Sequence, residues 1–161
     1  MSNRIARSGA VIAVLLALGS CAEAPQEDEK PVITFLNSPE AEARGLPFSQ
    51  AVRVGNLLFL SGQLGIEPGT SELVPGGIEA EANQALENMK AILERNGSSI
   101  DLVVKCTVFL ADIDEWPKMN EVYSRYFLST RPARSALAAS GLAMGARVEI
   151  ECIAVVDDAA Q

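Results

Sequence analysis

Two charged side chains near the C-terminus stand in otherwise apolar sequence, and they are the strongest candidates for chemistry. Arg134 lies in the run Pro-Ala-Arg-Ser-Ala-Leu that begins at Pro132, and Glu149 lies between Val148 and Ile150. A charge that a fold removes from water is costly unless another group pairs with it or a ligand uses it. Arg134 could therefore hold a carboxylate, and Glu149 could act as a base. The alternatives are a buried ion pair between them, or two side chains that reach solvent.

The composition limits the chemistry that these residues can serve. The chain has 161 residues, of which 48% are hydrophobic and 21% charged, so it can form one globular domain with a core. A formal net charge of −8 argues against nucleic-acid binding. The absence of histidine removes the commonest general base and metal ligand, and we expect no metal site. Catalysis would have to use carboxylates, Arg, Lys, hydroxyls, thiols or backbone amides.

The first 20 residues resemble a targeting segment. Arg4 and Arg7 precede the apolar residues 11–18, which are too few to span a bilayer. The next residues, Leu-Gly-Ser-Cys, resemble the lipobox of bacterial lipoproteins, in which the cysteine (here Cys21) is lipidated and becomes the N-terminus. An ordinary secretory signal and an uncleaved apolar stretch are the alternatives. We expect an exported protein on the periplasmic or cell-envelope side.

Lipid on Cys21 would be the only membrane anchor. Removal of residues 1–20 takes Arg4 and Arg7 from the 13 basic residues, which leaves 11 basic against 21 acidic ones and gives no electrostatic attraction to anionic lipid. The acidic residues 21–30 predict a solvated tether, and residues 31–157 predict the folded domain.

The two cysteines of the predicted domain, Cys106 and Cys152, each lie inside an apolar strand pattern. An exported compartment would permit a disulfide between them. A buried free thiol, however, behaves as a small hydrophobic group. We therefore expect two core thiols and no bridge.

Hydrophobic periodicity predicts an α+β domain with the order β-β-β-α-β-α-β-β. Strands are expected at residues 32–37, 48–54, 56–61, 102–110, 134–139 and 147–156. Helices are expected at residues 78–96 and from Asp112 or Asp114 to Arg131-Pro132. Each has an apolar stripe, formed by Ala82, Ala85, Leu86, Met89, Ile92 and Leu93 in the first helix and by Trp116, Met119, Val122, Tyr123, Tyr126 and Phe127 in the second. Two helices on one face of a single mixed sheet would give a two-layer sandwich.

Alternation in the two longest strands separates an apolar face from a mixed one. The apolar sets are Val104, Cys106, Val108 and Leu110 in the first strand, and Val148, Ile150, Cys152 and Ala154 in the second. We expect the apolar sets to meet the helices. The opposite face, with Lys105, Thr107, Glu149 and Glu151, is too mixed for a second core. It could meet another copy of the chain or line a cleft.

Six segments between residues 32 and 156 carry a family pattern, and they occur in the family's order. They are LSGQ at 60–63, LENMKAIL at 86–93, VKCTVFL at 104–110, MNEVY at 119–123, PARS at 132–135 and VEI at 148–150. Together they resemble the reactive intermediate deaminase family (Rid, also called RidA or YjgF-like). The resemblance implies an α+β fold similar to a bacterial chorismate mutase subunit, in a homotrimer with three clefts between subunits.

The resemblance also implies a reaction. Family enzymes hydrolyse enamines and imines, such as 2-aminoacrylate and 2-iminopropanoate, to 2-oxo acids and ammonia without a cofactor. Arg134 matches the arginine that binds the substrate carboxylate, and Glu149 matches the glutamate that positions and activates water. The Gly62 backbone amide, beside Ser61, matches a substrate contact, and Asn120 matches a residue near the cleft.

Two positions depart from the family pattern. Phe48 stands where a tyrosine is frequent, and Ala136 stands where a cysteine is frequent. Both changes bear on substrate preference. Two rival interpretations also stay open: a non-catalytic module that binds a small carboxylate or an envelope partner in the same cleft, and a structural protein in which Arg134 and Glu149 only pair with each other.

Overall fold

The structure is a computed structural model that describes residues 30–157. The predicted signal segment 1–20, Cys21 and the tether up to residue 29 lie outside the described residues. Within the described part of the chain, none of the helices has both the length and the apolar character needed to cross a membrane. The helices are α1 (Pro39–Ala43), α2 (Gly77–Arg95) and α3 (Trp116–Tyr126), and the strands are β1 (Ile33–Leu36), β2 (Ala51–Val54), β3 (Leu57–Leu60), β4 (Gln63–Leu64), β5 (Val103–Leu110), β6 (Ala133–Ala138) and β7 (Val148–Val155).

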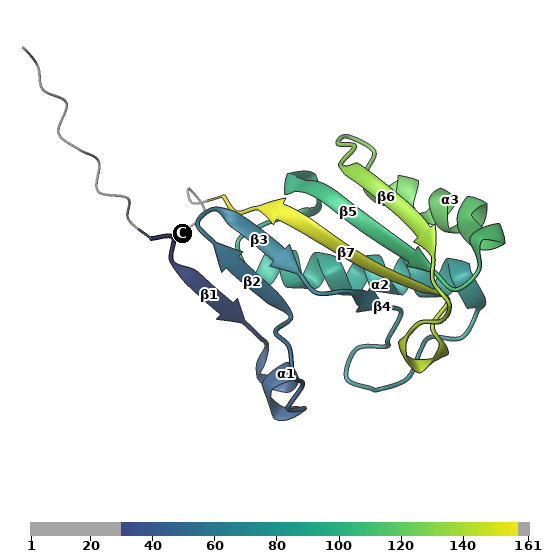
Figure 1. Cartoon of the computed structure of the whole chain (residues 1–161), viewed down its shortest axis with the longest axis horizontal. Helices are drawn as coiled ribbons and strands as arrows, with labels where there is room; N and C mark the ends of the chain where they lie inside the picture. Colours follow the sequence, from purple (N-terminus) through teal and green to yellow (C-terminus); the bar gives the residue numbers. More distant parts are fainter. Residues whose placement is uncertain (1–29, 158–161) are drawn as a thin grey trace, which may run out of the picture. The chain divides into compact units, whose positions relative to one another are not determined.

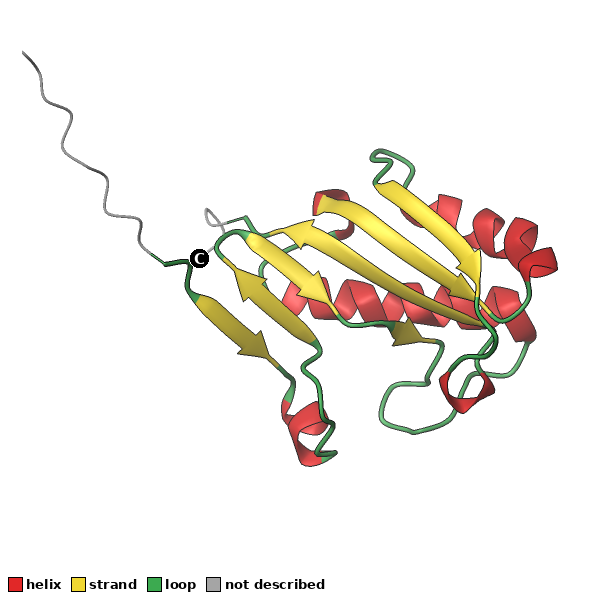
Figure 2. Ribbon diagram, viewed as in Figure 1, coloured by secondary structure: helices red, strands yellow, loops and turns green. Residues whose placement is uncertain are grey.

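The strands form one mixed sheet, and α2 and α3 cover the same face of it (Figure 1; Figure 2). The strand order is β1-β2-β3-β7-β5-β6, with β4 paired separately to β7. β5 and β6 run parallel, and α3 makes the crossover between them, because parallel strands need a long connection. The expected two-layer α+β architecture is confirmed. The face without helices is called the open face below.

Two short elements were not expected from the sequence. In α1, Ser38 caps the helix: its hydroxyl accepts a hydrogen bond from the Ala41 amide at 3.2 Å, and Pro39 occupies the first turn. β4 has two residues and pairs Leu64 with Glu149. Elements of two to five residues are too short to show a period, so hydrophobic spacing could not reveal them.

The core lies between α2 and the covered face of the sheet. The apolar stripe predicted for the first helix is confirmed, because its central members Ala82, Ala85, Leu86, Met89 and Leu93 are fully buried. Most of the predicted apolar strand faces meet it, and Val108, Leu110, Val148 and Ile150 are likewise fully buried. This packing orients every other residue of β7, including Glu149, toward the open face.

One residue of the predicted apolar face is placed wrongly. Val104 is 45% exposed, and Val103 is buried in its stead. The register between β5 and β7 shifts between Val103 and Lys105, as in a β-bulge. A bulge inserts one residue into the alternation and so reverses the faces before it.

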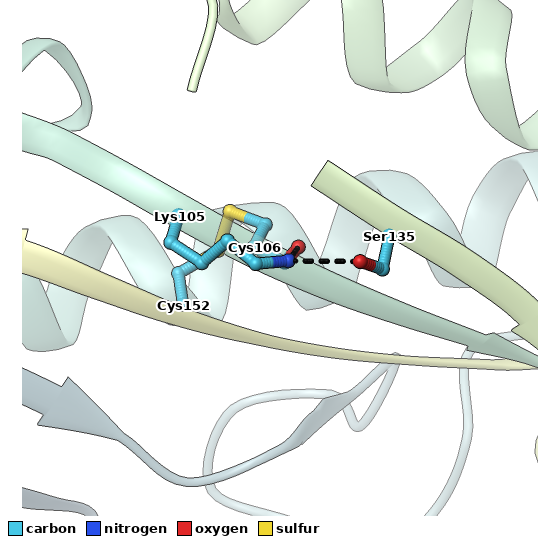
Figure 3. Close-up of a disulfide and its surroundings, with 4 residues drawn as sticks. All are labelled: Lys105, Cys106, Ser135 and Cys152. Carbon is cyan, nitrogen blue, oxygen red and sulfur yellow. Dashed lines mark hydrogen bonds between the residues drawn. A yellow bond between two sulfur atoms is a disulfide. The ribbon is translucent and has the colours of Figure 1, made fainter. Parts of the chain in front are cut away.

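The expectation of two free core thiols is also wrong, since Cys106 and Cys152 form a disulfide that joins β5 to β7 (Figure 3). The two residues are direct partners in the antiparallel register, with Cα atoms 4.1 Å apart. Residues opposite each other on neighbouring strands point their side chains to the same face. Both cysteines point into the core and are buried.

Candidate active site

The Arg134 side chain lies between β6 and α3. Its Nη2 donates a hydrogen bond to Asn120 Oδ1 at 2.8 Å. Its guanidinium carbon lies 4.4 Å from the ring centroid of Tyr123 and 5.6 Å from that of Trp116. Among residues 30–157, no carboxylate forms an ion pair with Arg134. The predicted site residues Arg134 and Asn120 are thus in direct contact, and the guanidinium keeps donors for a ligand.

Local sequence explains why α3 presents this surface. The Asp112 carboxylate accepts a hydrogen bond from the Asp114 amide at 2.9 Å and caps a single 3₁₀ turn before the helix. Pro117 then occupies the first turn of α3, where its missing N–H costs nothing. Trp116, Asn120 and Tyr123 follow at spacings of four and three residues, which places them on one side of the helix.

Glu149 lies on β7 on the open face, with Gly62 against it. A Cβ atom added to Gly62 would lie 2.7 Å from the Glu149 carboxyl carbon, so a larger residue there would force this side chain out of its position. Burial, and secondarily the charge of Glu151, raise the pKa of the Glu149 carboxyl above its ordinary value. A carboxylate with a raised pKa is a stronger base than an exposed one, which suits general-base chemistry.

Ser61 and Phe48 belong to the same side of the site as Gly62. The Ser61 hydroxyl donates a hydrogen bond to the backbone oxygen of Ser49 at 2.6 Å, next to Phe48. Phe48 is exposed, and its side chain adds apolar surface at the place where the family pattern has a phenol. The Ser61 hydroxyl proton is thus already used, and its oxygen can only accept from a ligand.

The start of β7 is anchored from α2. The buried Glu81 carboxylate accepts a hydrogen bond from the Arg147 amide at 2.8 Å. The Arg147 side chain in turn pairs with Glu115 at 2.6 Å. These contacts hold Arg147, two positions before Glu149, and thereby fix the start of β7, the strand that carries the base.

Within one chain, Arg134 and Glu149 lie on opposite faces of the sheet. Arg134 pairs in register with Cys106, whose side chain points into the core. Glu149 pairs with Phe109, which alternation along β5 places on the opposite face from Cys106. Two strand spacings and an offset of three residues put their Cα atoms about 14 Å apart. The two charges therefore cannot pair with each other within one chain.

The remaining predicted position, Ala136, stands two residues after Arg134 on the same side of β6 and is half-buried. The structure also adds two residues to the site, Trp116 and Tyr123. Helical periodicity placed both on the apolar face of the second predicted helix, and nothing in that pattern distinguishes a ring that covers a guanidinium from one that fills a core. Their spacing from Asn120 was the available signal. No cluster of three or more acidic, Cys or His residues in the described range could hold a metal ion.

Comparisons with known proteins identify the family of the chain. Residues 36–156 match the sequence model of the family described as Endoribonuclease L-PSP. The 2-iminobutanoate/2-iminopropanoate deaminase of Bos taurus is 48% identical over 121 residues, which are 75% of this chain and 88% of the relative.

Solved structures of the same family are similar to this chain. RidA from an Antarctic Psychrobacter species is 43% identical, with a TM-score of 0.66, over 69% of this chain and 89% of that one. TdcF of E. coli, solved with bound serine, is 36% identical, with a TM-score of 0.66, over 70% of this chain and 90% of that one. The chain therefore belongs to the Rid family, the RidA/YjgF-like proteins that the Endoribonuclease L-PSP model describes.

Proposed function

We propose that the protein is a cofactor-independent deaminase that hydrolyses small 2-imino acids, and their enamine tautomers, to 2-oxo acids and ammonia. The observation that carries this proposal is the Arg134 guanidinium, which is held by Asn120 and has no carboxylate partner among residues 30–157. A relative with 48% identity is named for this activity, and TdcF binds serine, a small molecule with a carboxylate.

The residues divide the reaction between them. Arg134 grips the substrate carboxylate through two N–H groups, which fixes the position of the neighbouring imine carbon. Glu149 accepts a proton from water while the water oxygen forms a bond to that carbon. That proton then passes to the nitrogen, which gives a carbinolamine. The carbinolamine hydroxyl proton moves to the nitrogen through Glu149 as the carbon–nitrogen bond breaks, so that ammonia leaves and the 2-oxo group forms. A general base placed in this way contributes roughly 10²–10⁴-fold in rate.

Two copies of the chain are needed to complete such a site. A three-carbon substrate cannot reach Arg134 on one face and Glu149 on the other across about 14 Å. We infer a homotrimer in which Arg134 of one subunit faces Glu149 of the next. Exposed apolar side chains on the open face support this assembly, because Phe35 is 71% and Phe59 39% exposed there.

A kinetic assay tests the activity. An amino-acid oxidase generates 2-iminopropanoate, and pyruvate release is followed with and without the purified protein. We expect acceleration by the wild type, little by Arg134→Ala and partial recovery in Arg134→Lys, since lysine keeps the charge but not the fork. Equal acceleration by wild type and Arg134→Ala would contradict the assignment. Saturable binding without turnover would instead support the non-catalytic binding module.

Subunit mixing tests the shared site. Arg134→Ala and Glu149→Gln chains are each expected to be inactive alone. Co-expressed in equal amounts, they should restore about a quarter of the wild-type sites, because each cleft draws its two residues from different chains. If one chain held the whole site, mixing would restore nothing. Sedimentation of the wild type gives the number of chains directly.

The name of the family model raises a second activity, RNA cleavage. The chain carries 13 basic and 21 acidic residues, so its net charge repels a polyanion. It also has no histidine to act as the acid and base of a nuclease. Imine hydrolysis is therefore the activity that we assign.

We also propose that the protein is exported and anchored through lipid on Cys21. The pattern of residues 1–21 supports this proposal, and so does the Cys106–Cys152 disulfide, since such bonds persist in oxidising compartments. Mass spectrometry of the native N-terminus would detect a lipidated Cys21. In Cys21→Ser the protein should leave the membrane fraction; an unmodified Met1 at the N-terminus would contradict the proposal.

A further inference from the structure

We propose that Trp116 and Tyr123 are positioning residues that hold the Arg134 guanidinium ready for the substrate carboxylate. The inference rests on the proposed function only in so far as Arg134 is the carboxylate-binding residue. According to this inference, the two aromatic rings of α3 contribute to ligand affinity. A ring that only filled the core or only lay at the surface would make no such contribution.

The three contacts of the guanidinium all come from one side of one helix. Asn120 fixes an edge through its hydrogen bond to Nη2 at 2.8 Å, and the Tyr123 and Trp116 rings lie 4.4 and 5.6 Å from the guanidinium carbon. Both ring distances are within the range of cation–π attraction. α3 therefore restrains both the position and the tilt of the cation before any ligand arrives.

The guanidinium retains free donors in this arrangement. It has five N–H groups, and the structure records one of its hydrogen bonds, to Asn120, among residues 30–157. The remaining donors lie in the guanidinium plane, whereas the aromatic rings contact the cation itself. A planar carboxylate can thus make two parallel hydrogen bonds along a free edge.

The Tyr123 contribution comes from its ring and not from its hydroxyl. Tyr123 is only 6% exposed, it lies 4.5 Å from the Phe127 ring, and its hydroxyl has no hydrogen-bond partner within the described chain. Burial raises the pKa of this phenol to about 12, so it stays neutral. Tyr123→Phe removes the unused hydroxyl and keeps the ring, which makes it the matched control for Tyr123→Leu.

Trp116 offers a second test that does not disturb the core. It is 37% exposed at the start of α3, so Trp116→Leu can be made with little change in packing, and Trp116→Phe keeps an aromatic face over the cation. Without the ring, Arg134 populates several rotamers, and the ligand has to select the competent one. This selection lowers affinity by the fraction of competent chains and leaves the chemical step unchanged.

The experiment measures steady-state hydrolysis of 2-iminopropanoate and, separately, pyruvate binding by NMR titration in the full set of variants. We expect Trp116→Leu and Tyr123→Leu to raise KM and the pyruvate Kd about threefold to tenfold, with kcat within about twofold of wild type. Trp116→Phe and Tyr123→Phe should stay within about twofold in all three constants. Thermal unfolding shows which variants are folded. If Tyr123→Leu does not fold, the comparison of Trp116→Leu with Trp116→Phe tests the positioning role by itself.

The outcomes separate the inference from the proposed function. A wild type that binds pyruvate through Arg134 but does not hydrolyse the imine would refute the deaminase assignment, and the pyruvate constants would still test the positioning role. A wild type that turns over while both Leu variants match their Phe controls would refute the positioning role alone. A fall in kcat at unchanged KM would refute it too, because the rings would then act on the chemical step.

Discussion

Reduction of the Cys106–Cys152 disulfide should destabilise the protein strongly while leaving its core filled. Both cysteines remain between β5 and β7 as thiols, so reduction removes no atoms from the core, and the two sulfurs move apart from bonding to van der Waals distance. What is lost is the restriction that the bridge places on the unfolded chain. Reduction therefore acts chiefly on the entropy of the unfolded chain.

The size of this effect follows from the distance between the cysteines along the chain. They are 46 residues apart, and closing a loop of this length lowers the entropy of the unfolded chain by about 13.5 cal/mol/K, or about 4 kcal/mol at room temperature. With a urea dependence of roughly 2 kcal/mol/M, the unfolding midpoint should fall by about 2 M.

Urea unfolding of Cys21→Ser, at one fixed protein concentration with and without a phosphine reductant, measures this shift. The Cys21→Ser background leaves only the two core cysteines, so thiol titration in denaturant should count none before reduction and two after it. Because both cysteines are buried, the reductant reaches them only when the protein unfolds, so the protein has to be incubated with it in urea until reduction is complete. A Cys106→Ser/Cys152→Ser variant should have an unfolding midpoint at or somewhat below that of the reduced protein, because its buried hydroxyl groups destabilise the core further.

The result that would refute this reasoning is an unchanged midpoint in samples whose two thiols are shown to be reduced. The bridge would then form without contributing to stability. Two free thiols in the untreated protein would refute the bridge itself and would return Cys106 and Cys152 to the role of small core residues.

Four further predictions concern the base and its surroundings. Glu149→Gln should lower kcat by roughly 10²–10⁴-fold in the imine assay. Since burial and Glu151 raise the pKa of Glu149, kcat/KM should fall as the pH drops through that raised pKa, and Glu151→Gln should move this acid limb to lower pH; an unmoved limb would show that another group titrates. Gly62→Ala should abolish activity by displacing the carboxyl, whereas Gly141→Ala, which meets nothing within 4 Å, should be silent in the same assay. Glu81→Ala should cost about 1–3 kcal/mol in urea unfolding, because it leaves a backbone amide unpaired, and Glu81→Gln, which keeps an acceptor, should cost less.

Much of the fold could be predicted because its signals are local. The stripe of α2 from Ala82 to Leu93 has a clear helical period, and the alternation in β7 separates Val148 and Ile150 from Glu149 without knowledge of any neighbour. The predicted faces failed at Val104, where a bulge that depends on the partner strand interrupts the alternation. The short elements α1 and β4 escaped for lack of length.

The site shows the same division. The sequence named Arg134, Glu149, Gly62 and Asn120 as candidates, the last two through the family resemblance, and its lack of histidine removed histidine-based chemistry. It could not place Arg134 relative to Glu149, because residues 133–138 show no apolar side that would identify the face turned toward the helices. Only the register of β6 on β5 and of β5 on β7 puts Arg134 and Glu149 on opposite faces.

Tertiary structure also decided two contacts between residues far apart along the chain. Cys106 and Cys152 became a bridge because β5 and β7 pair in the register that sets them opposite each other. Arg134 met Trp116 and Tyr123 because the crossover through α3 returns β6 beside the helix that precedes it. The amino-acid sequence by itself determined which residues carry charge, sulfur and aromatic rings, because these are properties of single side chains. Which of them meet depends on strand pairing and helix packing, which are properties of the whole domain.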